Sequence, residues 1–283
     1  MAKVLLVGAT GYLGGYIAQE LKKRKYFTRL VIRNVDKLDG KRIPFDEFLE
    51  AEVTKPFTLK NCCADIDIVI STVGITRQKD NLTYMDVDYQ ANINLLNEAK
   101  RSNVKKFIYV SVLNGDTLEN LKICEAKEKF VNTLVNSGLD YCIIRPNGFF
   151  SDMIEFYKMA KKGRVYLLGD GNKKANPIHG EDLAKVCVDA IEKHEKETEV
   201  GGPEILTQRD VADIAFCVSG NKKTITYIPE WLIKIILKLM RRFTKSQVYG
   251  PVEFFLTVAC MDMVAPKNGS HTLKEYFESN KNI

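Results

Sequence analysis

The segment KVLLVGATGYLGG, residues 3–15, decides the fold of this chain. Its first five residues read as an apolar strand, glycines follow at positions 8, 11 and 14, and a helix-forming run begins at Tyr16. Glycine permits the positive φ that a sharp reversal needs, and its missing side chain lets backbone N–H groups approach a pyrophosphate. Strand, turn and helix together predict a dinucleotide site rather than a merely structural turn. Its predicted cofactor-binding residues are Gly8, Thr10, Gly11, Tyr12, Leu13 and Gly14.

The composition excludes several classes of protein. The net charge of +6 is spread along 283 residues without a run of Lys or Arg, so a nucleic-acid partner is not expected. Seven scattered cysteines contain no C-x-x-C pair, which predicts reduced thiols, no metal site and a cytoplasmic protein. Because a strand is predicted at the very start, we expect no signal peptide, and no apolar run is long enough to predict a membrane-spanning helix.

Strand-like and helix-like segments alternate through the first half of the chain, which predicts a Rossmann α/β fold with a doubly wound parallel sheet. We expect strands at 28–32, 48–53, 67–71, 106–111 and 141–145, and helices at 16–25, 88–102, 119–136, 180–193 and 273–279. After Pro146 the pattern loosens into a small, mostly helical C-terminal lobe. The predicted NADP-binding domain is 1–150 plus 176–195, and the substrate lobe is 151–175 plus 196–283.

The residue that follows the second strand selects the nucleotide. An NAD-selective site carries Asp or Glu there, whereas this chain has Arg33, with Lys37 one turn later. Arg33 offers two guanidinium N–H groups to a 2′-phosphate, and Lys37 adds a charge, so we predict NADP(H); the alternative is that Arg33 is a solvated loop cation. Ligands of such sheets lie beyond the carboxyl ends of the strands. That rule adds the cofactor-binding candidates Val53, Ser71, Thr72, Val73, Gly74, Ser111, Pro146, Asn147, Gly148 and Phe149.

These residues resemble the short-chain dehydrogenase/reductase superfamily in its extended and atypical branch. The resemblance rests on the glycine turn, the Ile32-Arg33-Asn34 end of the second strand, the run 69–74, Asp88-x-x-x-Asn92, and the run 137–146. It looks most like NmrA-like NAD(P)-binding proteins and isoflavone-reductase-type enzymes. Four further runs are similar, more loosely, to chlorophyll-pathway divinyl reductases: Leu168-Gly169-Asp170-Gly171, Asn176-Pro177-Ile178, Glu181-Asp182-Leu183-Ala184 and Gly201-Gly202-Pro203.

The resemblance also raises the question of catalysis, because the superfamily uses Tyr-x-x-x-Lys with an assisting Ser. Lys127 and Ser111 match the Lys and the Ser and are the predicted catalytic residues, with Lys127 also holding the cofactor ribose; an ordinary helix cation is the alternative for Lys127. The Tyr position holds Ile123, which cannot donate a proton. Three readings stay open. Hydride goes to a polarised C=C bond, or a tyrosine at position 84, 89 or 157 supplies the proton, or the protein binds NADP(H) without catalysis.

Two other features bear on function. His179 precedes a helix start, where packing or capping explains it more simply than catalysis does. The run 231–243 is a basic amphipathic helix, for which a lobe helix packed on the core and a peripheral membrane contact are the alternatives. The sequence therefore predicts an NADPH-dependent reductase of a small, hydrophobic or conjugated substrate. The alternative is a non-catalytic NADP(H) sensor or assembly protein.

Overall fold

A computed structural model describes residues 2–38, 43–76, 78 and 81–281, without the side chain of Lys37. Its contacts divide the chain into two units. Unit 1 comprises residues 1–145 and 183–198, and unit 2 comprises residues 146–182 and 199–283. The sequence predicted the boundaries between the two units after residue 150 and near residues 176 and 195.

The predicted Rossmann fold is confirmed by a seven-stranded sheet in the order β3-β2-β1-β4-β5-β6-β9. From β3 to β6, neighbouring strands of this sheet pair in parallel. Val7 lies opposite both Val31 and Ser71, so the carboxyl ends of β1, β2 and β4 meet at one edge. The strands are β1 (Lys3–Val7), β2 (Phe27–Ile32), β3 (Glu47–Glu50), β4 (Ile68–Ser71), β5 (Lys106–Val110), β6 (Asp140–Pro146) and β9 (Glu197–Val200).

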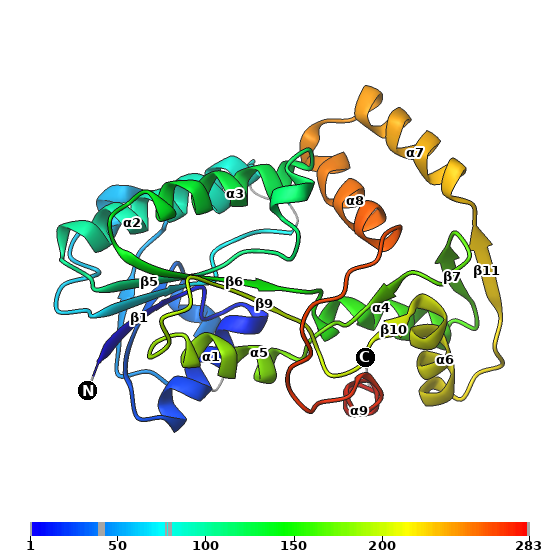
Figure 1. Cartoon of the computed structure of the whole chain (residues 1–283), viewed down its shortest axis with the longest axis horizontal. Helices are drawn as coiled ribbons and strands as arrows, with labels where there is room; N and C mark the ends of the chain where they lie inside the picture. The colour runs from blue at the N-terminus through cyan, green and yellow to red at the C-terminus, as the bar shows by residue number, and fades with distance from the viewer. Residues whose placement is uncertain (1, 39–42, 77, 79–80, 282–283) are drawn as a thin grey trace. The chain divides into compact units, whose positions relative to one another are not determined.

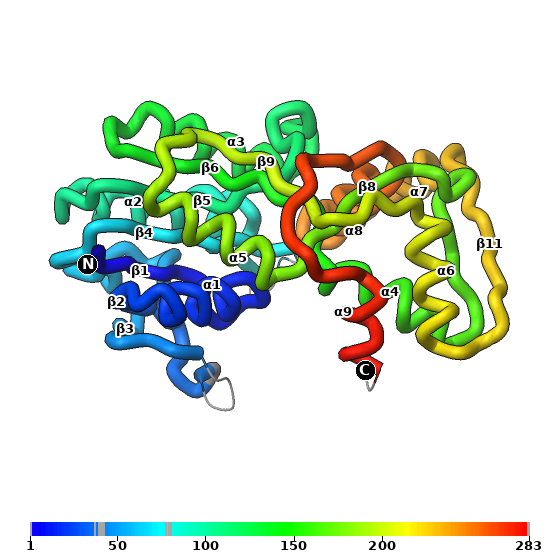
Figure 2. Tube along the Cα trace, turned by 60° about the horizontal axis from the view of Figure 1, so that its bottom comes forward, coloured from blue at the N-terminus to red at the C-terminus, as the bar shows by residue number. Residues whose placement is uncertain are grey.

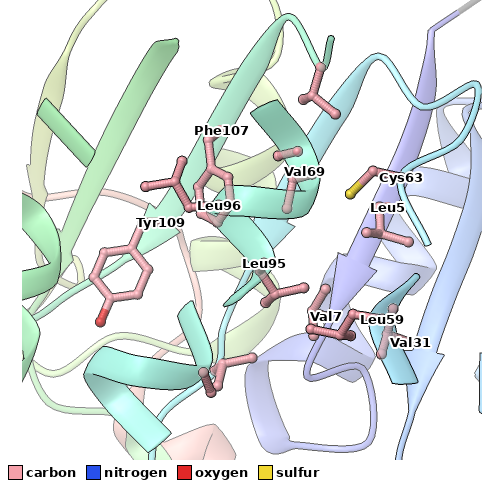
Figure 3. Close-up of a cluster of buried hydrophobic side chains, with 14 of the residues drawn as sticks. Leu5, Val7, Val31, Leu59, Cys63, Val69, Leu95, Leu96, Phe107 and Tyr109 are labelled. Atoms are coloured by element: carbon pink, nitrogen blue, oxygen red, sulfur yellow. The ribbon is translucent and has the colours of Figure 1, made fainter. Parts of the chain in front are cut away.

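Helices cover both faces of this sheet, which is why its central strands are nearly continuous apolar runs. In Figure 1, α2 and α3 lie on one face and α1 and α5 on the other. Their bounds are α1 (Tyr12–Lys23), α2 (Asn92–Arg101), α3 (Lys122–Val135) and α5 (Gly180–Asp189). A π-helical segment, Met85–Ala91, leads into α2. Figure 3 shows part of the core, where Leu5, Val69, Leu95 and Tyr109 are fully buried.

Unit 2 is built mainly from helices around its own core. Phe150, Tyr157, Phe216 and Phe277 are among the buried residues of that core. Its elements are α4 (Phe150–Lys161), β7 (Val165–Leu168), β8 (Lys174–Ala175), β10 (Leu206–Thr207), α6 (Gln208–Ser219), β11 (Ile225–Ile228), α7 (Glu230–Phe243), α8 (Ser246–Ala259) and α9 (Leu273–Ser279). Two small sheets, β10-β8 and β11-β7, complete it; Figure 2 shows the course of the chain through this unit and labels β8 and β11.

Several expected boundaries differ from the structure. The first helix begins at Tyr12, inside the glycine turn, and the helix expected at 180–193 ends at Asp189. The helix expected at 119–136 begins at Lys122, behind a short 3-10 segment. β9 was not expected at all, because its run Glu-Thr-Glu-Val is half charged and joins the sheet only through pairing at the edge.

Candidate cofactor site

The glycine turn occupies the carboxyl end of β1, and tight contacts explain its composition. Gly8 has φ +94°, and a Cβ there would lie 2.3 Å from the Thr72 hydroxyl oxygen. A Cβ on Gly14 would lie 2.2 Å from the Gly8 carbonyl oxygen, which is backbone and cannot move aside. The Gly11 N–H closes the turn by donating to that same carbonyl at 3.0 Å. Only glycine therefore fits at positions 8 and 14.

Helix α1 presents its amino terminus at this turn. Gly11 is the N-cap of α1 and its backbone is extended. Because glycine has no side chain, Gly11 makes no side-chain hydrogen bond to the first N–H groups of the helix. The first turn, Tyr-Leu-Gly-Gly, has no acidic residue to oppose the positive end of the helix dipole. Glycine turn and helix terminus thus form a cradle suited to a pyrophosphate.

Buried amides of α2 hold the two loops that border this cradle. Asn92 accepts a 2.6 Å hydrogen bond from the Ser71 hydroxyl and donates to the Val73 carbonyl at 3.2 Å. Asn94 donates to the carbonyl of Val53 at 2.9 Å. The loops after β3 and β4, where a nucleoside is expected, are therefore fixed by side-chain hydrogen bonds.

Arg33 follows β2 and is exposed. A hydrogen bond from Lys55 is the largest influence that lowers the pKa of Glu52, and the positive charge of Arg33 contributes to the same shift. Lys55 lies 2.7 Å from Glu52, so this carboxylate has its own cation beside the predicted 2′-phosphate position. Lys37, the second predicted phosphate contact, lies outside the described side chains.

Lys127 occupies the same edge of the sheet, on α3. Its Nζ lies 3.0 Å from Oδ1 of Asp88, which is fully buried, and the side chain of Lys127 is 12% exposed. The other oxygen of Asp88 accepts the backbone N–H of Ile75 at 3.2 Å. A Cβ on Gly74 would lie 2.6 Å from Asp88 Oδ1 and 2.9 Å from Lys127 Nζ. The loop after β4 therefore reaches this ion pair because residue 74 is glycine.

Tyr109 completes the surroundings of Lys127. Its ring centre lies 5.5 Å from the Lys127 Nζ, and its hydroxyl is buried. Burial raises the pKa of Tyr109 to about 12. Burial also acts to lower the pKa of Lys127, but Tyr109 and Asp88 outweigh it and the pKa is raised. Lys127 is therefore a cation at neutral pH.

The hydroxyl of Ser111 belongs to a separate, buried hydrogen-bond network. Its hydroxyl donates to Glu128 Oε1 at 3.0 Å, and Arg145 donates to both oxygens of Glu128 at 2.6 and 2.7 Å. A Cβ on Gly115 would lie 2.3 Å from Glu128 Oε1. The structure thus gives the Ser111 hydroxyl a carboxylate acceptor on α3.

The three tyrosines considered as proton donors are engaged elsewhere in the structure, and the expected tyrosine position is apolar. Ile123, four residues before Lys127, is buried. Tyr84 donates to the Thr76 carbonyl at 3.0 Å, and burial raises its pKa to about 12. Tyr89 is partly buried, with Lys129 over its ring, and Tyr157 is stacked on Phe277 inside unit 2. The three candidate tyrosines thus already have hydrogen-bonding or packing partners.

The candidates after β6 are described within unit 2. Asn147 is buried, and its amide donates to Asn176 Oδ1 at 2.9 Å. Phe149 forms an isolated bridge with Ile178 and is the N-cap of α4. Pro146 is the last residue of β6, and Gly148 is exposed. Their predicted contact with the nicotinamide stays a prediction.

His179 has the packing environment expected of it. Its Nδ1 accepts the Glu181 N–H at 3.2 Å, and its ring stacks on His271 with 4.3 Å between centres. Among the described residues, only His179, Glu181 and His271 bring ligand-type atoms of three residues within 4.8 Å. Stacked imidazoles at an interplanar angle of 24° present their nitrogens side by side rather than toward one ion. His271 Nδ1 also lies 3.0 Å from Asp182 Oδ2, so polar contacts and ring packing account for this cluster.

Asp88 and Tyr109 are the two residues that sequence reasoning did not assign to the site. In the sequence, the only signal for Asp88 is its spacing to Asn92, because residues four apart lie on one face of a helix. Tyr109 stands within an apolar strand, and no local pattern distinguishes it from a core residue. Together the glycine cradle, the fixed loops and Lys127 fit a dinucleotide cofactor at this edge.

Comparison with known proteins also indicates a protein that binds a dinucleotide cofactor. A family model described as NAD(P)H-binding matches residues 8–194. The photosystem II assembly factor Ycf39 of Trieres chinensis is 24% identical over 89% of this chain and 77% of its own length. The chloroplastic divinyl chlorophyllide a 8-vinyl-reductase of Arabidopsis thaliana is 25% identical over 95% of this chain and 72% of its own.

Solved structures share the fold. An NADPH-dependent quinone oxidoreductase of Escherichia coli, complexed with NADPH, superposes with a TM-score of 0.73 at 19% identity, covering 99% of this chain and all of the other. A nucleoside-diphosphate-sugar epimerase of Staphylococcus aureus gives 0.75 at 16% identity over 98% of this chain and 99% of its own. No helix among the described residues combines the length and apolar content needed to cross a membrane.

Proposed function

The chain belongs to the NAD(P)H-binding family, and from this premise we propose that it is an NADPH-dependent reductase of a small, hydrophobic or conjugated substrate. One observation carries the proposal. Lys127 is a cation held by the buried Asp88 at the edge where the cradle lies, beside a glycine whose missing side chain leaves room. Burying this ion pair costs desolvation free energy, and it leaves a fixed ammonium where the superfamily places the lysine that holds the nicotinamide ribose.

Different residues of the chain bind different parts of NADPH. Gly8, Gly11 and Gly14 admit the pyrophosphate to the amino terminus of α1. Arg33 pairs with the 2′-phosphate through charge-assisted hydrogen bonds. Lys127 donates to the hydroxyls of the nicotinamide ribose, and Asp88 orients its ammonium. When bound, NADPH supplies a hydride.

The substrate class follows from the missing tyrosine. A carbonyl oxygen that becomes an alkoxide needs a proton donor at hand, and Ile123 cannot provide one. A conjugated C=C bond makes a weaker demand, because the electron-withdrawing group delocalises the charge until water protonates it. The names of two matched proteins, a vinyl reductase and a quinone oxidoreductase, support an unsaturated substrate.

A second function is favoured by a specific observation. The tyrosine position is occupied by a buried isoleucine, and the matched Ycf39 proteins are named as assembly factors. A non-catalytic NADP(H)-binding sensor or assembly protein therefore stands as the alternative. In that case the ion pair of Lys127 holds the nucleotide without assisting a reaction.

Isotope transfer separates the two functions. The purified protein is incubated with NADPH deuterated at the transferring carbon and a lipid-containing extract of its own cells, and products are read by mass spectrometry. We expect one metabolite to gain a single deuterium. Lack of transfer, with NADPH binding confirmed by fluorescence titration, would decide for the sensor or assembly protein.

The cofactor choice is tested at the same time. Arg33→Ala removes charged hydrogen bonds worth about 1.5–3 kcal/mol, so the Kd for NADPH should rise about tenfold to a hundredfold. The Kd for NADH should stay unchanged, because NADH lacks the 2′-phosphate. Lys100→Ala is the matched control, since Lys100 is an exposed cation in the last turn of α2 and is not a predicted cofactor contact. An unchanged preference in Arg33→Ala would refute the assignment of NADPH.

A further inference from the structure

Helix α7 carries an exposed row of large apolar side chains. Trp231, Ile235, Leu239 and Phe243 recur at every fourth position and are 63%, 46%, 51% and 75% exposed. Residues four apart lie above one another on one side of a helix, so these four form a continuous ridge. Scattered exposed apolar residues are normal on a protein, but a contiguous row of this size marks an interaction surface.

The ridge is not the face by which α7 packs into unit 2. Ile233 is the buried residue of α7, and α8 is its packing partner. In Figure 1, α7 lies beside α8 and apart from α4 and α6 of the same unit. Arg241 donates to the buried carboxylate of Glu253 on α8, which ties the two helices together. The fold of unit 2 therefore uses one side of α7 and leaves the ridge to solvent.

A row of cations flanks the ridge. Lys234, Lys238 and Arg242 are exposed, and each precedes a ridge residue by one position, which is about 100° around the helix. Between residues 231 and 250 the sequence contains five Lys or Arg and no Asp or Glu. The surface around the ridge therefore carries mainly positive charge, with Glu230 four positions before Lys234 and Glu253 paired with Arg241 as its acidic neighbours.

We propose that α7 docks the protein on a bilayer that contains anionic lipid, with the ridge entering the boundary between headgroups and acyl chains. Apolar side chains on one face and Lys or Arg on its flank are the pattern of helices that lie in a membrane interface. Lys234, Lys238 and Arg242 reach the lipid phosphates by extending their long side chains toward the headgroups. This inference goes beyond the proposed function, because it requires neither cofactor nor substrate.

Charge argues against a second copy of the chain as the occupant. A two-fold interface pairs the same patch with itself, so two ridges in contact would bring two cationic rows together. An anionic bilayer instead neutralises these cations, and each one near its surface strengthens binding about fivefold. An anionic bilayer thus offers both an apolar layer for the ridge and negative charge for the cations beside it.

Vesicle flotation of the full chain tests the proposal. The probes are phosphatidylcholine vesicles with and without phosphatidylglycerol, each at low and high salt. The charge variant is Lys234→Gln, Lys238→Gln and Arg242→Gln together, which should bind anionic vesicles about a hundredfold more weakly. Its matched control removes three exposed lysines elsewhere in unit 2, namely Lys162→Gln, Lys222→Gln and Lys274→Gln. The control should lose far less affinity.

Trp231 provides a direct readout, because it is the one tryptophan of the chain and lies on the ridge. Its emission should shift to the blue with anionic vesicles. Leu239→Ser with Phe243→Ser should abolish the shift and weaken binding at least tenfold. Circular dichroism establishes that each variant is folded.

Three results would overturn the proposal. The first is no binding of the wild type to anionic vesicles, and the second is equal loss of binding in the control variant. The third is a dimer seen by analytical ultracentrifugation without lipid that the Leu239→Ser, Phe243→Ser variant dissociates, which would identify a second copy as the occupant.

Discussion

The ion pair between Lys127 and Asp88 allows a quantitative prediction. Two unit charges 3.0 Å apart attract by about 5 kcal/mol at an effective dielectric constant of 20. Desolvation of both groups offsets much of this attraction, because Asp88 is fully buried and Lys127 is 12% exposed. Removal of one partner leaves the other charge buried and unpaired, at a cost of about 3–5 kcal/mol. We therefore expect Asp88→Asn and Lys127→Met each to lower the free energy of unfolding by about 3 kcal/mol.

The double variant distinguishes this pair from two independent core residues. Asp88→Asn combined with Lys127→Met leaves neither charge of the pair, so the double variant should lose about 2–3 kcal/mol less than the sum of the single variants. Urea unfolding at neutral pH supplies the free energies. Far-UV circular dichroism is the right probe, because Trp231 lies in unit 2 and reports on a different part of the chain.

Additivity within about 0.5 kcal/mol would refute the reasoning, since it would mean that the two charges do not interact. Cofactor binding adds a second readout. Lys127→Met should raise the Kd for NADPH about tenfold through the lost hydrogen bond to ribose. Lys129→Met makes the same change at an exposed position of α3 and should leave the Kd unchanged.

Three further predictions rest on other parts of the molecule. Gly14→Ala places a Cβ 2.2 Å from the Gly8 carbonyl oxygen, so it should abolish NADPH binding and cost several kcal/mol of stability; a normal Kd in titration would contradict the close-packing argument. The thiol reagent DTNB should react quickly with the exposed Cys217 and the half-buried Cys260, and only at the rate of unfolding with the five buried thiols. Tyr109 ionises near pH 10 in the unfolded chain but near 12 in the fold, so it binds more protons when folded and its contribution is lost as pH rises through that window. Above pH 10 the unfolding free energy should therefore fall more steeply in the wild type than in Tyr109→Phe, by about 1.4 kcal/mol per pH unit; parallel curves would count against it.

Local chemistry explains why so much of unit 1 was visible in the sequence. The strand at 3–7, its glycine turn and the following helix need particular backbone conformations that few residues other than glycine adopt. Parallel strands buried on both faces must be apolar throughout, so 68–71 and 106–110 are evident without a structure. Arg33 was predicted as a cofactor contact from its distance along the chain to the glycines, which the geometry of one strand-helix-strand unit sets.

Position alone did not reveal the partners of the candidate residues. Ser111 matches the expected pattern, yet Glu128 and Arg145, which surround its hydroxyl, stand 17 and 34 positions away. β9 is similar, since a half-charged run of four residues becomes a strand only where β6 leaves an edge to pair with. Neither the network around Ser111 nor the pairing of β9 with β6 produces a periodic pattern in the sequence.

By itself, then, the sequence predicted the strand-turn-helix of a dinucleotide site, a doubly wound parallel sheet, and a cation where the 2′-phosphate is expected. These features depend on neighbours within a few residues or one turn. Tertiary structure alone decided that Lys127 has Asp88 as its partner and that the apolar ridge of α7 is exposed instead of buried. The reason is physical: burial and charge pairing are settled by which surfaces meet when the chain packs, and residues far apart in sequence supply those surfaces.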